Sequence, residues 1–194
     1  MLTEQQINKA ANDLYAAEVN RKQIAPLTLT YPDMDMDDAY AVQSAWVERK
    51  LQTGRKVIGY KIGLTSRAMQ RTMKIDTPDY GVLLDDMVFA DGGNICASDF
   101  LDPQIEVELA FVLKKPLSGE NVTVEQVLDA TDYVVPAFEL IAARSVRVDP
   151  KTGYARKVFD TISDNAANAG IITGGRQVKP GEVDLRWCGA IVEL

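Results

Sequence analysis

The first 54 residues repeat apolar side chains at the spacing of an α-helix. Thr3 and Gln6 have the pattern of a capping box, so we expect a helix from Thr3 to about Lys22. A second helix is predicted from about Asp35, where aspartates suit a helix N-terminus, to Gly54, which ends it. The apolar positions that follow helical spacing are Ile7, Ala10, Ala11, Leu14, Ala17, Ala39, Val42 and Trp46.

After Lys56 the apolar residues come in short runs that are typical of strands. We therefore place a boundary near residue 54, between an N-terminal helical subdomain over 1–54 and a β-rich domain over 55–194. The predicted fold class is α+β. Strands are expected at 57–64, 82–84, 103–113, 133–142, 168–173 and 185–194, and further helices at 65–73, with Ala68 and Met69 packed inward, and at 123–130.

The predicted strand at 103–113 carries two acids. Glu106 and Glu108 share one face because side chains alternate along a strand, and apolar residues on the other face predict that the strand is buried. At roughly 3.3 Å rise per residue, their Cβ atoms lie about 6.5 Å apart, so one oxygen of each can reach a single ion. Such a pair favours a divalent cation, because adjacent carboxylates repel each other. The alternative is an amphipathic strand with both glutamates in water.

A third acid, Glu139, lies in the apolar run at 133–142. A carboxylate in such surroundings needs a cation, a hydrogen-bond network or a raised pKa. Arg144 is one candidate partner. Pro136 in the same run favours an edge strand or a bulge.

Lys61 shares a strand face with Gly59 and Gly63, and these glycines leave space beside its ammonium where a ligand could bind. The alternative is a lysine that reaches solvent from an edge strand, with the glycines placed for a bend. Asp79 follows a proline and precedes a glycine by two residues. An aspartate in such a setting is commonly a turn residue that accepts hydrogen bonds from nearby backbone amides.

The composition narrows the chemistry. Lys and Arg number 21 against 28 Asp and Glu, a net charge of −7, which argues against nucleic acid or an anionic membrane as the main partner. Cys96 and Cys188 have no metal-ligand spacing, and the N-terminus lacks the apolar segment of a signal peptide, so we expect a cytoplasmic protein. The sequence contains no histidine, so acid–base chemistry must use carboxylates, lysine, tyrosine or metal-bound water, and a metal must accept oxygen ligands.

These candidate residues form an ordered set along the chain. The set consists of Lys61 in Gly-Tyr-Lys-Ile-Gly-Leu-Thr-Ser, Asp79 in Pro-Asp-Tyr-Gly, Glu106 and Glu108 in Ile-Glu-Val-Glu, Glu139 in Pro-Ala-Phe-Glu-Leu, and Ser-Asp-Asn at 163–165. It resembles the hydratase and decarboxylase branch of the fumarylacetoacetate hydrolase superfamily, and the likeness runs over essentially the whole chain.

This resemblance implies that Glu106, Glu108 and Glu139 hold Mg²⁺ or Mn²⁺. Lys61 and Asp79 would be the catalytic residues of the same pocket. The expected activity is that of a lyase, a hydratase that adds water to a 2-hydroxy-dienoate or 2-oxo-enoate dicarboxylate in aromatic compound catabolism. The resemblance also implies a homo-oligomer.

Weaker candidates for holding the substrate carboxylate are Ser163 and the backbone near Leu83. Three other activities stay open. They are a 4-oxalocrotonate-type decarboxylase, a carbon–carbon hydrolase of the superfamily, and a non-catalytic subunit that binds metal and dicarboxylate.

For the fold, the resemblance implies an N-terminal helical part followed by a catalytic domain with a mixed β-sheet or β-barrel-like architecture. Chains of this family continue past the position of Leu194 through further strands and a helix. We therefore expect the catalytic domain to be truncated at the C-terminus, with an open sheet edge.

Overall fold

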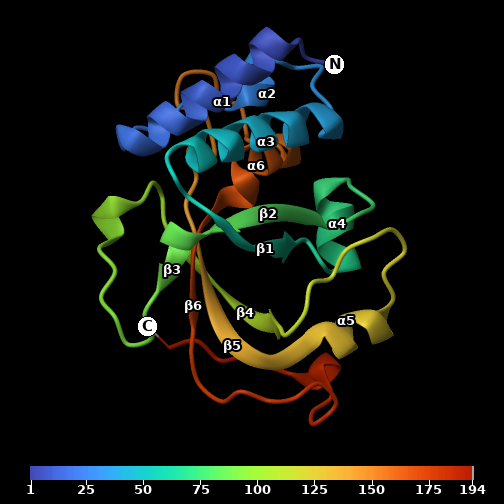
Figure 1. The fold of residues 1–194 in the computed structure, drawn as a ribbon. Helices are drawn as coiled ribbons and strands as arrows, with labels where there is room; N and C mark the ends of the chain where they lie inside the picture. Colours follow the sequence, from blue (N-terminus) through green and yellow to red (C-terminus); the bar gives the residue numbers. More distant parts are fainter. Residues whose placement is uncertain (194) are drawn as a thin grey trace.

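The computed structural model describes residues 1–193, in which the N-terminal helices lie above two β-sheets (Figure 1). The helices are α1 (Glu4–Val19), α2 (Leu27–Thr30), α3 (Met36–Gln52), α4 (Arg67–Met73), α5 (Val124–Ala130) and α6 (Val158–Ser163). The strands are β1 (Val57–Gly63), β2 (Asp79–Leu84), β3 (Val88–Phe89), β4 (Gln104–Leu113), β5 (Thr131–Ile141) and β6 (Asn168–Thr173). The 3₁₀ turns are η1 (Asp85–Met87), η2 (Ala97–Asp99), η3 (Asn165–Ala167) and η4 (Leu185–Trp187).

The two long helices begin where the sequence predicts. Thr3 caps α1 by accepting a hydrogen bond from the Gln6 backbone N–H at 3.3 Å. Asp35 caps α3 in the same way, accepting from the Asp38 N–H at 2.9 Å. Each cap satisfies a backbone donor that has no partner inside the helix. The short helix α2, which follows Pro26, was not predicted.

The largest hydrophobic core lies between these helices and reaches past residue 54. Trp46 of α3 is 1% exposed, and Leu84 of β2 and Ile162 of α6 are fully buried. Burial of such side chains contributes about 1.5–3 kcal/mol each and joins the helices to β2 and α6. The division of the chain at residue 54 stays a prediction.

The strands form two open sheets, one antiparallel and one mixed, as expected for an α+β fold. β1 pairs antiparallel with β2, and the second sheet has the order β3-β6-β5-β4. In the second sheet the β4–β5 and β5–β6 pairs are antiparallel, and the β3–β6 pair is parallel. Residues 1–193 form no closed barrel, so that part of the expected architecture is not seen.

Strand β4 differs from the expected buried strand. It has the predicted position, but its apolar face is open, with Ile105 57% exposed and Phe111 41% exposed. The physical reason is that no described element packs over this face, so its apolar side chains stay exposed.

Three smaller predictions are wrong. Pro136 lies in the central strand β5, where it is tolerated because the ladder with β6 starts only at Ala137. Ala68 and Met69 of α4 are exposed instead of packed inward. The predicted final strand is replaced by η4 and irregular chain up to residue 193, and Leu194 lies outside the described residues. Among residues 1–193, no helix combines the length and apolar character needed to span a membrane.

Candidate active site and metal centre

The three predicted metal ligands meet on two neighbouring strands. Glu106 of β4 stands directly opposite Glu139 of β5 in the antiparallel ladder, and Glu108 follows on the same face of β4. One carboxylate oxygen from each glutamate lies within 4.8 Å of the other two. Glu106 and Glu108 are exposed, whereas Glu139 is buried, so the cluster has one side in the protein and one side open to solvent.

Lys61 reaches this cluster from the other sheet. Its Nζ lies 3.3 Å from Oε1 of Glu139, and the two side chains are only 12% and 7% exposed. The contact is an ion pair without hydrogen-bond alignment, because Glu139 Oε1 has no hydrogen-bond partner among the described residues. Lys61 therefore does not extend into solvent, which was the alternative interpretation of its place on the strand.

Asp79 is the first residue of β2 and pairs with Gly63 of β1. Its side chain is buried, and Oδ1 accepts no hydrogen bond from the described residues. A Cβ atom at Gly63 would lie 2.2 Å from this oxygen and 3.2 Å from Lys61 Nζ. The space that the sequence predicts beside Lys61 therefore exists at Gly63, and it brings the lysine and the aspartate together.

Three carboxyl groups of the site, those of Glu139, Glu108 and Asp79, have a pKa above its usual value. Burial raises the pKa of Glu139 from 4.5 to about 7, although Lys61 acts in the opposite direction. Burial, followed by the charge of Glu106, raises the pKa of Glu108. Burial also raises the pKa of Asp79, against the effect of Lys61. Four carboxyl groups around one ammonium make an acidic centre that a divalent cation would neutralise.

The two weaker candidates for holding a substrate carboxylate, Leu83 and Ser163, lie in different parts of the fold. Leu83 of β2 pairs with Gly59. It lies on the same sheet face as Asp79, because side chains alternate along a strand and the two residues are an even number of positions apart. Ser163 ends α6, is fully buried, and its hydroxyl has no hydrogen-bond partner among the described residues. No described contact joins Ser163 to the acidic cluster.

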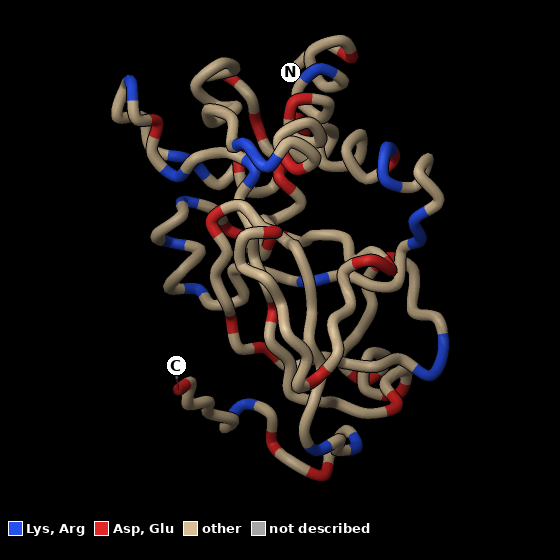
Figure 2. The backbone as a smooth tube through the Cα atoms, turned by 90° about the vertical axis from the view of Figure 1, so that its left-hand side faces the viewer, with Lys and Arg blue, Asp and Glu red and all other residues tan. Residues whose placement is uncertain are grey.

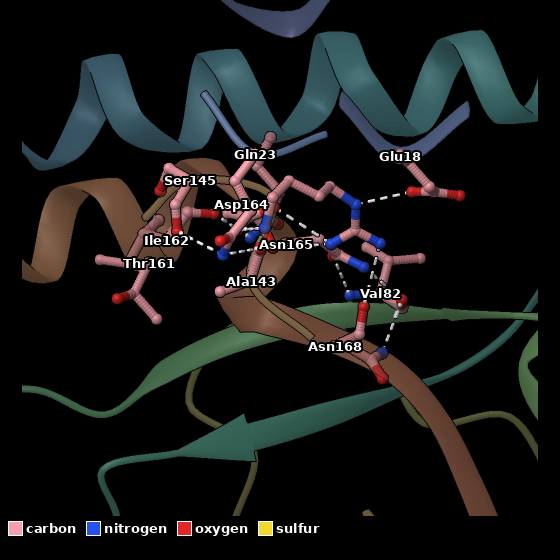
Figure 3. Close-up of polar contacts among 12 residues, drawn as sticks. Glu18, Gln23, Val82, Ala143, Ser145, Thr161, Ile162, Asp164, Asn165 and Asn168 are labelled. Carbon is pink, nitrogen blue, oxygen red and sulfur yellow. Dashed lines mark hydrogen bonds and ion pairs between the residues drawn. The ribbon is translucent and has the colours of Figure 1, made fainter. Parts of the chain in front are cut away.

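Arg144 is not the partner of Glu139. It donates from Nε to Glu18 of α1 at 2.6 Å and from Nη1 to Asp164 at 3.1 Å, and its guanidinium lies 4.5 Å from the ring centre of Trp46. These groups lie on the helical side of the molecule, as Figure 3 shows for Glu18 and Asp164. Arg144 and Glu139 are close in the sequence, which suggested a contact between them, but the structure pairs Arg144 with other residues.

Sequence reasoning also missed the surroundings of Gly81, which stands opposite Lys61 in the β1–β2 ladder. A Cβ atom there would lie 2.5 Å from the backbone oxygen of Asn165 and 3.2 Å from Lys61 Cγ. The run of short polar residues at 163–165 was the available signal. Figure 2 shows acidic positions along the strands as well as in helices and loops, whereas most basic positions lie in the helices and loops.

No protein-family model matches the chain. It is 58% identical over 182 residues to 2-oxo-hept-4-ene-1,7-dioate hydratase of Escherichia coli, covering 94% of this chain and 68% of the relative. Two solved structures of 4-oxalocrotonate decarboxylase from Pseudomonas putida G7, one with calcium and acetate and one with magnesium and adipate, superpose with a TM-score of 0.86. Both are 37% identical in sequence to this chain. Each match covers 96% of this chain and 68% of the decarboxylase chain. The chain therefore belongs to the hydratase and decarboxylase branch of the fumarylacetoacetate hydrolase superfamily.

Proposed function

We propose that this protein is a divalent-metal-dependent hydratase that adds water to a 2-oxo-enoate dicarboxylate, of the 2-oxo-hept-4-ene-1,7-dioate type, in aromatic compound catabolism. The observation that carries the proposal is the meeting of three glutamate oxygens within 4.8 Å beside the Lys61 ammonium. The 58% identity to a hydratase with this substrate supports the same activity here.

The residues present fit a divalent metal. Glu139 Oε1 and Asp79 Oδ1 are buried without hydrogen-bond partners, and the glutamates offer only oxygen ligands, which Mg²⁺ and Mn²⁺ prefer. Glu106, Glu108 and Glu139 would hold the ion, and Mg²⁺ or Mn²⁺ is our proposal for it. When bound, it supplies a positive charge that polarises the 2-oxo group of the substrate.

The chain's own residues then move protons and orient water. Lys61 transfers a proton between the enol oxygen and the carbon chain as the 2-hydroxydienoate becomes the 2-oxo-enoate. Asp79 or Glu108 orients the water that adds at the position conjugated to the ketone. The backbone near Leu83 and the Ser163 side chain are the weaker candidates for holding the substrate carboxylate.

The test is turnover of the seven-carbon 2-hydroxydienedioate with Mg²⁺, followed as loss of the ultraviolet absorbance of the conjugated diene. Lys61→Gln should lower kcat by about 10²–10⁴-fold, because a positioned proton-transfer group is lost. Calorimetry should show that the same variant still binds Mg²⁺. The exposed Lys22→Gln is the matched control and should keep wild-type turnover.

Two results would contradict the proposal. One is wild-type protein that binds Mg²⁺ and the dicarboxylate but does not consume the dienoate. The other is a Lys61→Gln variant with unchanged kcat.

The second candidate function is a 4-oxalocrotonate-type decarboxylase, favoured by the solved decarboxylase structures at a TM-score of 0.86. Release of carbon dioxide from 4-oxalocrotonate separates it from the hydratase. A subunit that binds metal and dicarboxylate without turnover is the third candidate, and it would show binding in the calorimeter with neither reaction.

We also propose a cytoplasmic homo-oligomer. The exposed apolar face of β4 supports self-association, and light scattering tests it.

A further inference from the structure

The turn η3 has a backbone conformation that ordinary residues rarely adopt. Asn165, Ala166 and Ala167 have φ values of 53°, 51° and 57°, which place three consecutive residues with side chains in the left-handed region. Each such residue is strained because its Cβ approaches the following carbonyl oxygen. Strain of this kind persists only where the surrounding structure enforces it, and it gathers at functional sites.

Contacts on both sides hold the turn. The residue before it, Asp164, accepts hydrogen bonds from the backbone N–H of Arg144 at 2.7 Å and from its guanidinium at 3.1 Å. At the other end, the backbone oxygen of Ala167 accepts from the Ala142 N–H at 2.8 Å. The strained residues are therefore fixed between a buried ion pair and the end of the second sheet.

The side chain of Asn165 makes hydrogen bonds to the backbone of β2 that a neighbouring strand would otherwise make. It is fully buried, its Oδ1 accepts from the Val82 N–H at 2.7 Å, and its Nδ2 donates to the Val82 oxygen at 2.9 Å (Figure 3). Asn168 donates to the same oxygen at 3.0 Å. Because β1 occupies the other edge of β2, these amides fix the position of β2 where no strand pairs with it.

The same turn also touches the site. Gly81 precedes Val82 and stands opposite Lys61, and a Cβ atom at Gly81 would lie close to both the backbone oxygen of Asn165 and Cγ of Lys61. A shift of Asn165 therefore moves Val82 and Gly81, and with them the part of β2 that faces the Lys61 stem. The metal-binding glutamates stand on β4 and β5, outside this contact.

We infer that Asn165 is a positioning residue, which holds β2 and the Lys61 stem so that the Lys61 ammonium stays beside Glu139. The inference rests on the proposed function for its kinetic consequence. Its structural consequence, the placement of the Lys61 ammonium, can be measured without turnover.

The test compares Asn165→Asp and Ala166→Gly with wild type. Asn165→Asp keeps the acceptor for the Val82 N–H but turns an oxygen toward the Val82 carbonyl, so kcat should fall by roughly 10–100-fold. Binding of Mg²⁺ should change by less than about threefold, because its ligands are untouched. Ala166→Gly relieves the left-handed strain, so its Tm should stay equal or rise while kcat falls. A purely structural role would lower stability and activity together.

The second readout is the rate of Lys61 acetylation, followed by peptide mass spectrometry. It should rise several-fold in Asn165→Asp, because Lys61 is released from Glu139, while acetylation of exposed Lys22 stays constant. An inactive wild type would reject the proposed function, and the Lys61 acetylation rate would still decide the role of Asn165. Unchanged kcat and unchanged Lys61 acetylation would overturn the inference, as would a loss of kcat matched by loss of Mg²⁺ binding.

Discussion

At the scale of single residues, Glu139 decides how the site responds to pH. Its pKa is raised from 4.5 to about 7 in the folded protein without metal, chiefly by burial. The unfolded chain therefore loses this proton at lower pH than the native protein does. Without metal, the contribution of Glu139 to stability falls as the pH rises from about 4.5 to about 7, and the full cost of its buried charge, on the order of 3 kcal/mol, is present above that range.

Glu139→Gln should therefore have opposite effects with and without metal. In EDTA at pH 8 the free energy of unfolding of the variant should be about 1–3 kcal/mol higher than that of wild type. This difference should shrink toward pH 4.5. With saturating Mg²⁺ the order should reverse, because the ion stabilises only a protein that retains its ligand. Urea denaturation at both pH values measures this. A variant that is less stable than wild type under all conditions would contradict the assignment.

At the scale of elements, local signals predicted α1 and α3 well. Their capping boxes and apolar spacing lie within a few residues of each other. The pairing of Glu106 with Glu139, and the approach of Lys61 from another sheet, depend on strand register across distant segments, so only the resemblance placed them together. The burial of β4 was mispredicted for the same reason, because it depends on what covers the strand.

The ladder of β1 and β2 offers a matched pair of glycine variants. Gly59 and Gly63 share the face of Lys61, but a Cβ atom at Gly59 meets only Leu83 Cδ1 at 3.7 Å. At Gly63 it meets Asp79 Oδ1 at 2.2 Å, so the aspartate or the strand must shift. Gly63→Ala should lower kcat/KM at least tenfold and cost about 1–3 kcal/mol of stability, whereas Gly59→Ala should stay within about twofold of wild type.

Steady-state kinetics on the two variants checks this difference. Equal losses in Gly59→Ala and Gly63→Ala would mean that flexibility of β1, and not the space beside Asp79, is the property that matters.

At the scale of the whole molecule, Arg144 connects the helices to the loop that supports the site. Its guanidinium joins Glu18 of α1 to Asp164 and lies over Trp46 of α3. The side chains of Arg144 and Asp164 are 4% and 0% exposed, so neither can exchange its partner for water. Removing one member of such a pair leaves an uncompensated buried charge, although Arg156 lies 3.6 Å from Asp164 and offsets part of it.

Arg144→Ala should therefore cost about 3–5 kcal/mol of unfolding free energy. The control is Arg147→Ala, because Arg147 pairs with Asp102 at 2.6 Å while both side chains are more than 40% exposed, and such a pair contributes about 0–1 kcal/mol. Urea denaturation of both variants gives the comparison. If the two arginines cost the same, the helices and the loop at 164–167 are held together by apolar packing alone, and the buried ion pair adds little to the connection.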